Sequence, residues 1–408
     1  MTLKIHTNPR YWLMIAVFYL LLFQDPLQNL FEGFVYIDEF FALAGLASIC
    51  YQIVKRGKLR ISGKAKGMVL PLIIFLLTGI LGNLIFRYQP TTAVLIDIYT
   101  NFKFFLSMVT GYYLLRGIDK WHGRDGLIFH AKAMALLLFV LLCADQLLHV
   151  FDSPGTRYGI RVTQLMYGHA THLAAAVVFL LSVLTMFYHD KNLPHIVMSL
   201  CVLVFTVRGK AIAGAAIYCV VFYFIVIYRK KLRYWHVVLI ALIALLIGWE
   251  QIYGYYLENV TESARAMLTT TSFEILKDYF PIGTGFGTYA SAQASEHYSP
   301  VYIKYGLYNI YGLAENKTWF GSDTFWPIIF GQTGFIGSIC FVMAIGMLFL
   351  QILKVRKTSI PAYAAGIFIF MYLMISSTSE AAFNNAISIP LAMMLGYVLS
   401  LEGKTEAT

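Results

Sequence analysis

The chain has 408 residues, of which 59% are hydrophobic and 13% are charged, and its mean hydropathy is +0.68. Soluble domains carry about 25% charged residues, so this composition excludes an ordinary soluble globular protein. The formal net charge is +10. Because the basic residues lie between apolar runs, they indicate membrane topology and not nucleic-acid binding.

Apolar runs recur along the chain, several of them near the length of about 20 residues that a membrane-spanning helix needs. The first run follows Lys4 and Arg10, and no small-residue cleavage site comes after it. We therefore expect a retained first helix and not a signal peptide. We predict about 12 spans, at 11–23, 34–54, 68–86, 101–116, 127–149, 168–188, 194–207, 211–228, 234–253, 324–350, 361–378 and 383–401.

The distribution of Lys and Arg between the spans predicts which side of the membrane each connecting segment occupies. With the N-terminus in the cytoplasm, most of the 31 Lys and Arg residues fall in cytoplasmic segments, as the positive-inside rule requires. The richest of these segments is 55–66, with the sequence KRGKLRISGKAK. This alternation predicts that both termini are cytoplasmic and that 254–323 forms one long loop on the opposite, external side.

The external loop is too apolar for a disordered linker. Its segment 262–279 has apolar residues at helical spacing, so we expect a folded, partly helical cap. The predicted fold class is an all-α polytopic membrane protein. Its predicted parts are nine spans in 1–253, the cap in 254–323, and three spans with a cytoplasmic tail in 324–408.

The five cysteines are scattered through apolar segments, without the spacing of a metal site or a disulfide framework. We interpret them as small core residues. His169 and His172 share a helix face, but two histidines without a third ligand do not predict a metal site. We therefore expect no metal and no cofactor.

A few cations oppose the charge bias because they lie on the external side. Arg157 and Arg161 are in a short loop, Arg208 and Lys210 are in TVRGKA, and Arg265 begins the cap. Such cations are costly unless they are paired or face water. Guanidinium groups bind phosphate oxygens in pairs, which predicts a phosphate site. The alternatives are binding to lipid headgroups, pairing with nearby acids, and snorkelling of the lysine.

Three glycines, Gly283, Gly285 and Gly287, occupy alternate positions in PIGTGFGTY. They predict unusual backbone angles or close approach to a ligand, and a tight structural turn is the alternative. Their spacing is not that of a dinucleotide site. Tyr289 and Tyr298 suit stacking on sugar faces, although tyrosine also favours membrane interfaces.

The sequence GSDTFWP places Asp323 at the outer start of a span. An acid at this position is either the N-cap of the following helix or a general base that faces an external cavity. Further acids cluster near the outer ends of spans, namely Asp38, Glu39, Asp145, Glu250 and Glu380.

Together these segments resemble the O-antigen polymerase and O-antigen ligase-like superfamily of bacterial envelope glycosyltransferases. The resemblance spans most of the chain in its pattern of spans and one long external loop, and it is sharpest over about 157–338. TVRGKA is similar to the family's Thr-x-Ser-Arg-Gly-Ala segment, with Val207 in place of Ser and Lys210 before the Ala. Arg265 with Leu268, the glycine-rich 281–289 and the segment 323–337 are the other matches.

The resemblance implies a GT-C-like fold in the bacterial inner membrane, with the active site facing the periplasm. It implies metal-independent polymerisation of undecaprenyl-pyrophosphate-linked oligosaccharide repeat units into O-antigen, capsule or exopolysaccharide. The implied partners are these lipid-linked glycans, membrane lipids and a chain-length regulator, with no nucleic acid. Ligases of the family carry His where this chain has Asp323, which favours a polymerase.

The resemblance also implies residue roles. Arg208 and Arg265 would hold the pyrophosphate, and Asp323 would be the base or would orient it. Arg157 and Arg161 would assist or bind the second lipid-linked glycan. The functions left open are an O-antigen ligase, a polysaccharide transporter or flippase, and a structural assembly subunit.

Overall fold

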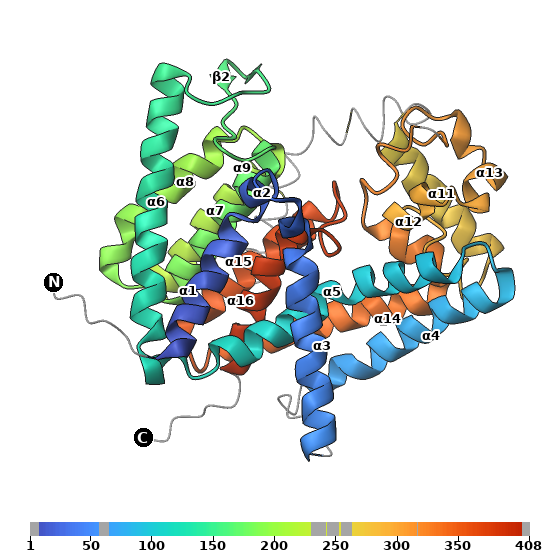
Figure 1. Ribbon diagram of the computed structural model, residues 1–408, viewed down its shortest axis with the longest axis horizontal. Coiled ribbons are helices and arrows are strands. Elements are labelled where there is room, and N and C mark those ends of the chain that lie inside the picture. Colours follow the sequence, from blue (N-terminus) through green and yellow to red (C-terminus); the bar gives the residue numbers. More distant parts are fainter. Residues whose placement is uncertain are drawn as a thin grey trace.

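The fold is given by a computed structural model, which describes residues 8–56, 65–229, 263–315 and 317–401, together with residues 242 and 253. The described chain is mostly helical. Helices occupy every predicted span range that falls within it, whereas the range 234–253 lies almost entirely outside it. Figure 1 shows a helical bundle on the left and a group of shorter helices at the upper right.

The α-helices in chain order are α1 (Pro9–Leu22), α2 (Gln24–Gln28), α3 (Ile37–Arg56), α4 (Val69–Phe86), α5 (Thr91–Leu115), α6 (Gly123–Leu148), α7 (Ala170–Met186), α8 (Leu193–Phe205), α9 (Gly209–Val221), α11 (Ala264–Asp278), α12 (Ala292–Glu296), α13 (Pro300–Lys304), α14 (Trp326–Val355), α15 (Ile360–Ser376) and α16 (Ile389–Ser400). A π-helical turn, Phe222–Ile227, extends α9. Two short strands, β1 (Thr156–Arg157) and β2 (Ile160–Arg161), pair antiparallel. Short 3₁₀ turns lie at Glu32–Tyr36, Ala65–Met68, Ile118–Trp121, Asp190–Asn192, Leu307–Asn309 and Ala386–Ser388.

Six helical segments of the described chain are long and apolar enough to cross a membrane. They are Glu32–Lys55, Val69–Phe86, Thr91–Leu115, Gly123–Leu148, Gly209–Ile227 and Trp326–Val355. Shorter apolar helices lie at Pro9–Leu22, Ala170–Met186, Ile360–Ser376 and Ala386–Ser400. The architecture is that of an all-α protein with several candidate membrane spans.

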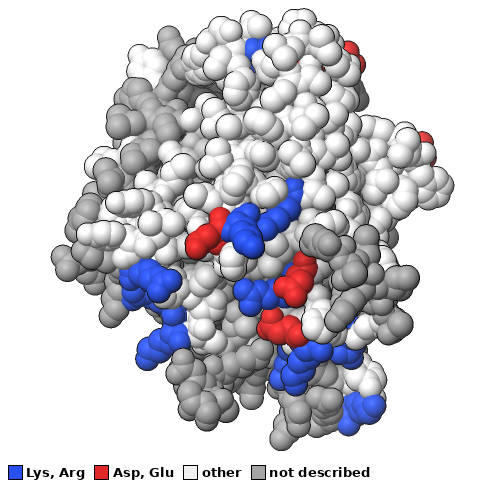
Figure 2. Space-filling model, turned by 90° about the vertical axis from the view of Figure 1, so that its left-hand side faces the viewer, with Lys and Arg blue, Asp and Glu red and all other residues white. Residues whose placement is uncertain are grey.

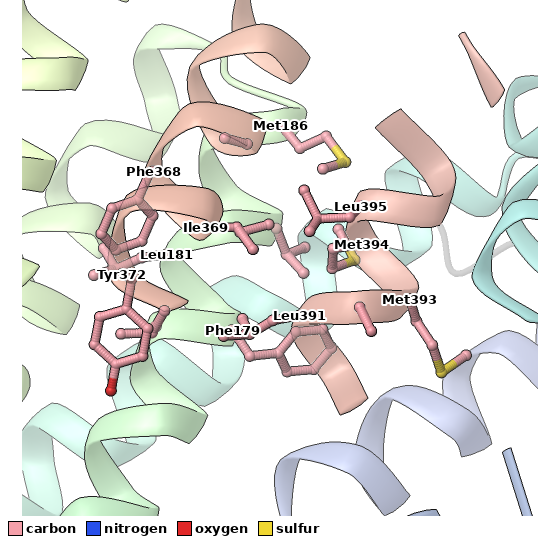
Figure 3. Packing of buried hydrophobic residues seen from close by; sticks show 14 of the residues in the cluster. Phe179, Leu181, Met186, Phe368, Ile369, Tyr372, Leu391, Met393, Met394 and Leu395 are labelled. Atoms are coloured by element: carbon pink, nitrogen blue, oxygen red, sulfur yellow. The ribbon is translucent and has the colours of Figure 1, made fainter. Parts of the chain in front are cut away.

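The centre of the bundle is apolar. Helix α7 is buried along nearly its whole length, and it packs against α15 and α16. Figure 3 shows Phe179 of α7, Phe368 of α15 and Leu391 of α16 among the side chains that meet there. A helix that is apolar on all sides belongs at the centre of a bundle.

Glycines allow the closest approach between helices, most clearly where α5 crosses α16. A Cβ atom added at Gly111 would overlap the backbone of Met393, and one at Gly396 would overlap the backbone of Met108. Lipid tails are as apolar as leucine, so helices in a membrane associate chiefly through close packing at small residues. This crossing fixes the long, oblique α5 against the bundle.

The start of α5 corrects the predicted span 101–116, because the helix already begins at Thr91. Asp97 and Lys103 lower the hydropathy of the segment, yet both side chains are buried. The Asp97 carboxylate accepts hydrogen bonds from the Gly287 N–H (2.9 Å) and from Asn101 Nδ2 (3.1 Å). Lys103 forms an ion pair with Asp38 of α3. Buried charged side chains that are hydrogen-bonded or ion-paired in this way are tolerated inside a membrane protein.

The interpretation of all five cysteines as core residues is wrong. Cys340 is buried, but Cys50, Cys143 and Cys219 are exposed on the helix surfaces. The lipid-facing surface of a membrane protein is as apolar as its interior. Apolar neighbours in the sequence therefore do not reveal which side of a helix a cysteine occupies.

The predicted cap is partly helical where it is described, and the helix expected in 262–279 is confirmed as α11. Leu268, Ile275 and Tyr302 form its own apolar cluster, which also includes Ile328 of α14. In Figure 1 these cap helices lie above α4 and α14, away from both chain termini. Figure 2 shows that, on the face in view, Lys and Arg gather in the lower half below a broad uncharged area.

Candidate functional site

Arg208 lies at a break between two helices. Helix α8 ends at Phe205, and α9 begins at Gly209 with Arg208 as its N-cap residue. Val207, directly before the arginine, has φ +48°, which is an outlier for a β-branched residue. The turn directs Arg208 toward α7, where its Nη2 lies 2.8 Å from His169 Nε2.

His169 is the N-cap residue of α7. Desolvation and the nearby positive charge of Arg208 lower the pKa of the His169 imidazole to about 4. The ring is therefore neutral at neutral pH, and its Nε2 lies within hydrogen-bond distance of the guanidinium. This pair joins the beginning of α7 to the beginning of α9.

Lys210, two residues after Arg208, forms an ion pair with Glu380 in the loop after α15. The two side chains are only 13% and 15% exposed. The charges of Arg208 and Arg265 also act on Lys210, so Lys210 lies within electrostatic range of both arginines. Lys210 therefore links the two arginines electrostatically, although its own ion pair is with Glu380.

Arg265 lies in the first turn of α11, and its Nη2 is 3.1 Å from Asp323 Oδ2. Asp323 is in the turn before α14, whose N-cap residue is Phe325. The interpretation of Asp323 as a helix cap is therefore wrong. Its carboxylate instead orients the arginine, and the two side chains remain 25% and 31% exposed.

Asp25 of α2 and its partner His172 add an acid and a second histidine to this group. Its Oδ1 lies 2.5 Å from His172 Nδ1, and its Oδ2 accepts a hydrogen bond from the Gly168 N–H at 2.7 Å. Burial acts to raise the pKa of Asp25, but the bonds and charge of His172 together with the Gly168 N–H lower it below its usual value. A cavity of about 120 Å³ lies beside this pair.

These contacts form three groups, which the electrostatic action of Arg208 and Arg265 on Lys210 relates to one another; we call the whole set the outer cluster. Its members are Asp25, His169, His172, Arg208, Lys210, Arg265, Asp323 and Glu380. Its basic residues lie at the N-termini of α9 and α11, and Arg208 also contacts the N-cap residue of α7; each of these N-termini carries partial positive charge. Helix N-termini together with Arg and Lys form a site that suits a phosphate-bearing anion.

The glycine-rich segment has a packing role that explains its composition. The N–H groups of Thr284 and Gly285 bond to the carbonyls of Gly331 and Gln332 in α14, at 3.0 and 2.8 Å. A Cβ at Gly283 or Gly285 would overlap neighbouring atoms, and Gly283, Gly285 and Gly287 all have positive φ. The alternative of a tight structural turn accounts for these residues without a ligand.

Tyr289 and Tyr298 differ in position within the cap. Tyr289 is fully buried, and its hydroxyl donates to the Leu268 carbonyl at 2.6 Å. Tyr298 is partly exposed, and its hydroxyl donates to the Leu313 carbonyl at 3.1 Å. Tyr289 is therefore part of the cap's own core, and Tyr298 alone of the two presents surface to a ligand.

The remaining predicted cations lie on the β1–β2 hairpin. Arg157 is exposed, whereas Arg161 lies 3.6 Å from the buried carboxylate of Asp145 and donates to the Phe151 carbonyl. The chain after the hairpin bonds to the end of α8, through the Thr163 N–H and the Phe205 carbonyl. The hairpin thus adjoins the segment that carries Arg208 without joining the outer cluster.

The sequence reasoning missed Asp25 and gave no role to His172 or Glu380. The available signals were acids at the outer ends of spans and two histidines three residues apart. The sequence did not predict that Asp25 pairs with His172, because the two residues are 147 positions apart.

Fold and site together define an all-α protein with several candidate membrane spans and a charged cluster where three helices begin. Comparison with protein-family models finds no match, and no curated protein matches significantly.

Proposed function

We propose that the protein is a glycosyltransferase that polymerises polyprenyl-pyrophosphate-linked oligosaccharide repeat units at the outer face of a membrane. The observation that carries this proposal is that Arg208 at the start of α9 contacts the N-cap residue of α7, while Lys210 lies within electrostatic range of both Arg208 and Arg265, the latter in the first turn of α11. A pyrophosphate attached to a membrane-embedded lipid is an anion that such a site would bind.

The reaction needs little beyond this charge. Pyrophosphate is already a good leaving group, so the protein must stabilise the negative charge that develops on it and accept a proton from the attacking hydroxyl. Arg208 and Arg265 would contact the pyrophosphate, and Lys210 would add to the positive field. Asp323, which holds Arg265 in place, would fix the donor geometry.

The resemblance in the sequence gives the finer proposal. The chain would be a bacterial inner-membrane protein with about 12 spans, both termini in the cytoplasm and the outer cluster facing the periplasm. The product would be O-antigen, capsule or exopolysaccharide. Asp323, where ligases carry His, favours repeat-unit polymerisation over transfer to lipid A core.

Two observations favour a second candidate, an ion-coupled transporter. Lys103 pairs with Asp38 inside the helical bundle, and α14 is interrupted at Gly334, with φ 61° and ψ −160°. Buried ion pairs and broken helices are typical of transporters. We favour the glycosyltransferase because Lys103 is neutralised by its partner and the break in α14 is filled by the glycine-rich segment.

The proposal predicts that Arg208→Ala and Arg265→Ala each lower the rate of polymer formation strongly. Loss of a preorganised charged donor costs about 3 kcal/mol of transition-state stabilisation, which corresponds to about a hundredfold in rate. The measurement is the chain length of glycan formed by the purified protein in proteoliposomes with undecaprenyl-pyrophosphate-linked repeat units.

Lys277→Ala is the matched control, because Lys277 is exposed on the same helix as Arg265. It should leave the rate unchanged. If both arginine variants still form long polymer at the wild-type rate, the pyrophosphate role is wrong. Transport of the intact lipid-linked substrate without extension would favour the second candidate.

A further inference from the structure

We propose that His172, oriented by Asp25, is the general base that accepts the proton of the attacking sugar hydroxyl; this inference rests on the proposed function. Neither residue belongs to the segments that the family resemblance singles out. The pair lies at one end of the outer cluster, where α2 meets the first turn of α7.

The Asp25 carboxylate is held on both of its oxygens. Oδ2 accepts from the Gly168 N–H, and Oδ1 accepts from His172 Nδ1. Because the lowered pKa of Asp25 keeps it ionised, the hydrogen in this bond belongs to the imidazole. A neutral imidazole with hydrogen on Nδ1 carries its lone pair on Nε2, which is the arrangement of an oriented general base.

The imidazole is also accessible. The His172 side chain is 39% exposed, and it lines the cavity of about 120 Å³ together with Gln24, Gln28 and Tyr167. A space of this size admits a few water molecules or part of a sugar ring, since water occupies about 30 Å³ in the liquid. The pair therefore borders a space that can hold an acceptor hydroxyl.

The position of the pair relative to the cations suits a transfer reaction. The His172 ring centroid is 5.9 Å from that of His169, and His169 is in contact with Arg208. Of the charged and titratable groups near His172, Asp25 holds its Nδ1, the His169 ring packs edge-on against its ring, and Tyr167 lines the same cavity. A donor pyrophosphate on the cations would place its sugar close to the base.

Asp323 is less suited to this role. One of its oxygens is engaged by Arg265 at 3.1 Å, and moving that carboxylate would release an arginine assigned to the pyrophosphate. His172 accepts a proton without disturbing a phosphate-binding cation. We therefore assign Asp323 as a positioning residue and His172 as the base.

The hydroxyl oxygen of the acceptor sugar forms a bond to the anomeric carbon of the donor, and the bond from that carbon to the pyrophosphate oxygen breaks. The electron pair of the broken bond leaves with the polyprenyl pyrophosphate, next to Arg208 and Arg265. The hydroxyl proton moves to His172 Nε2, and the Asp25 carboxylate stabilises the resulting imidazolium.

The test uses the full chain in proteoliposomes, with undecaprenyl-pyrophosphate-linked repeat units as donor and acceptor. His172→Gln should lower the maximal rate by about a hundredfold or more, the usual contribution of a general base. Donor binding should remain at the wild-type level, and the fall of the rate at acidic pH should disappear. In His172→Ala, added imidazole should restore part of the rate through the enlarged cavity, which a purely structural role would not produce.

His297→Gln, the same change at an exposed position of the cap, should leave the rate and the pH profile unchanged. Asp323→Asn should reduce donor binding more than the maximal rate. If His172→Gln keeps the wild-type rate and pH profile while Arg208→Ala is inactive, the base assignment is overturned and the proposed function stands. If the wild-type protein forms no polymer, both are overturned.

Discussion

The basic side chains at the centre of the outer cluster have their partners in other segments of the chain. Arg208 is bonded to His169, Lys210 to Glu380 and Arg265 to Asp323. Pairing lowers the cost of keeping charges partly shielded from water, and removal of one partner leaves the other uncompensated. Each partner also holds its cation in one orientation, which preorganised catalysis requires.

At the same scale, the low pKa of His169 predicts a pH dependence of stability. The unfolded imidazole binds a proton below its ordinary pKa of 6.5, but the folded one binds it only near pH 4. The unfolded state therefore holds more protons in this window, and stability falls as the pH is lowered through it. The melting temperature in detergent should drop more steeply from pH 6.5 to about 4 for wild type than for His169→Asn. Equal slopes for the two proteins would contradict the assignment.

At the scale of elements, the interruption of α14 decides how the cap meets the membrane helices. Gly334 has a backbone conformation that only glycine adopts easily, and a Cβ there would overlap the backbone of Gly283. Asn83 of α4 completes the junction through paired hydrogen bonds to Phe286, at 2.8 and 2.9 Å. The glycine-rich segment thus lies between α4, α5 and α14 and forms hydrogen bonds with each of them.

Gly334→Ala and Gly283→Ala should each destabilise the protein by about 2 kcal/mol or more, because strained backbone and steric overlap add. The melting temperature in detergent is the measurement. Gly346→Ala, in the same helix but with open space around the new Cβ, should leave it unchanged or raise it slightly. An unchanged melting temperature for Gly334→Ala would show that the junction is not required.

At the scale of the whole molecule, the outer cluster joins segments that the distribution of Lys and Arg alone assigns to the external side of the membrane. Asp25 follows the first span, His169 begins the sixth, and Glu380 follows the eleventh, all predicted to be external. Their contacts in the folded chain agree with that common side.

This topology predicts which positions a membrane-impermeant maleimide reaches in intact cells. In a variant whose native cysteines are replaced, Lys277→Cys on the cap should react without permeabilisation. Lys120→Cys, exposed in the loop between α5 and α6, should react only after the membrane is opened. The reverse pattern would invert the orientation, and reaction at both positions would argue against a membrane-embedded fold.

The sequence by itself determined the all-α class, the position of most apolar helices and a helix in the cap, since these follow from runs and periods of neighbouring residues. It also singled out Arg208, Lys210, Arg265 and Asp323. Only the tertiary structure decided their partners, brought Asp25 and His172 beside them, and placed Tyr289 in the core of the cap. Pairing between distant segments depends on how helices pack, and apolar neighbours do not distinguish lipid from protein interior.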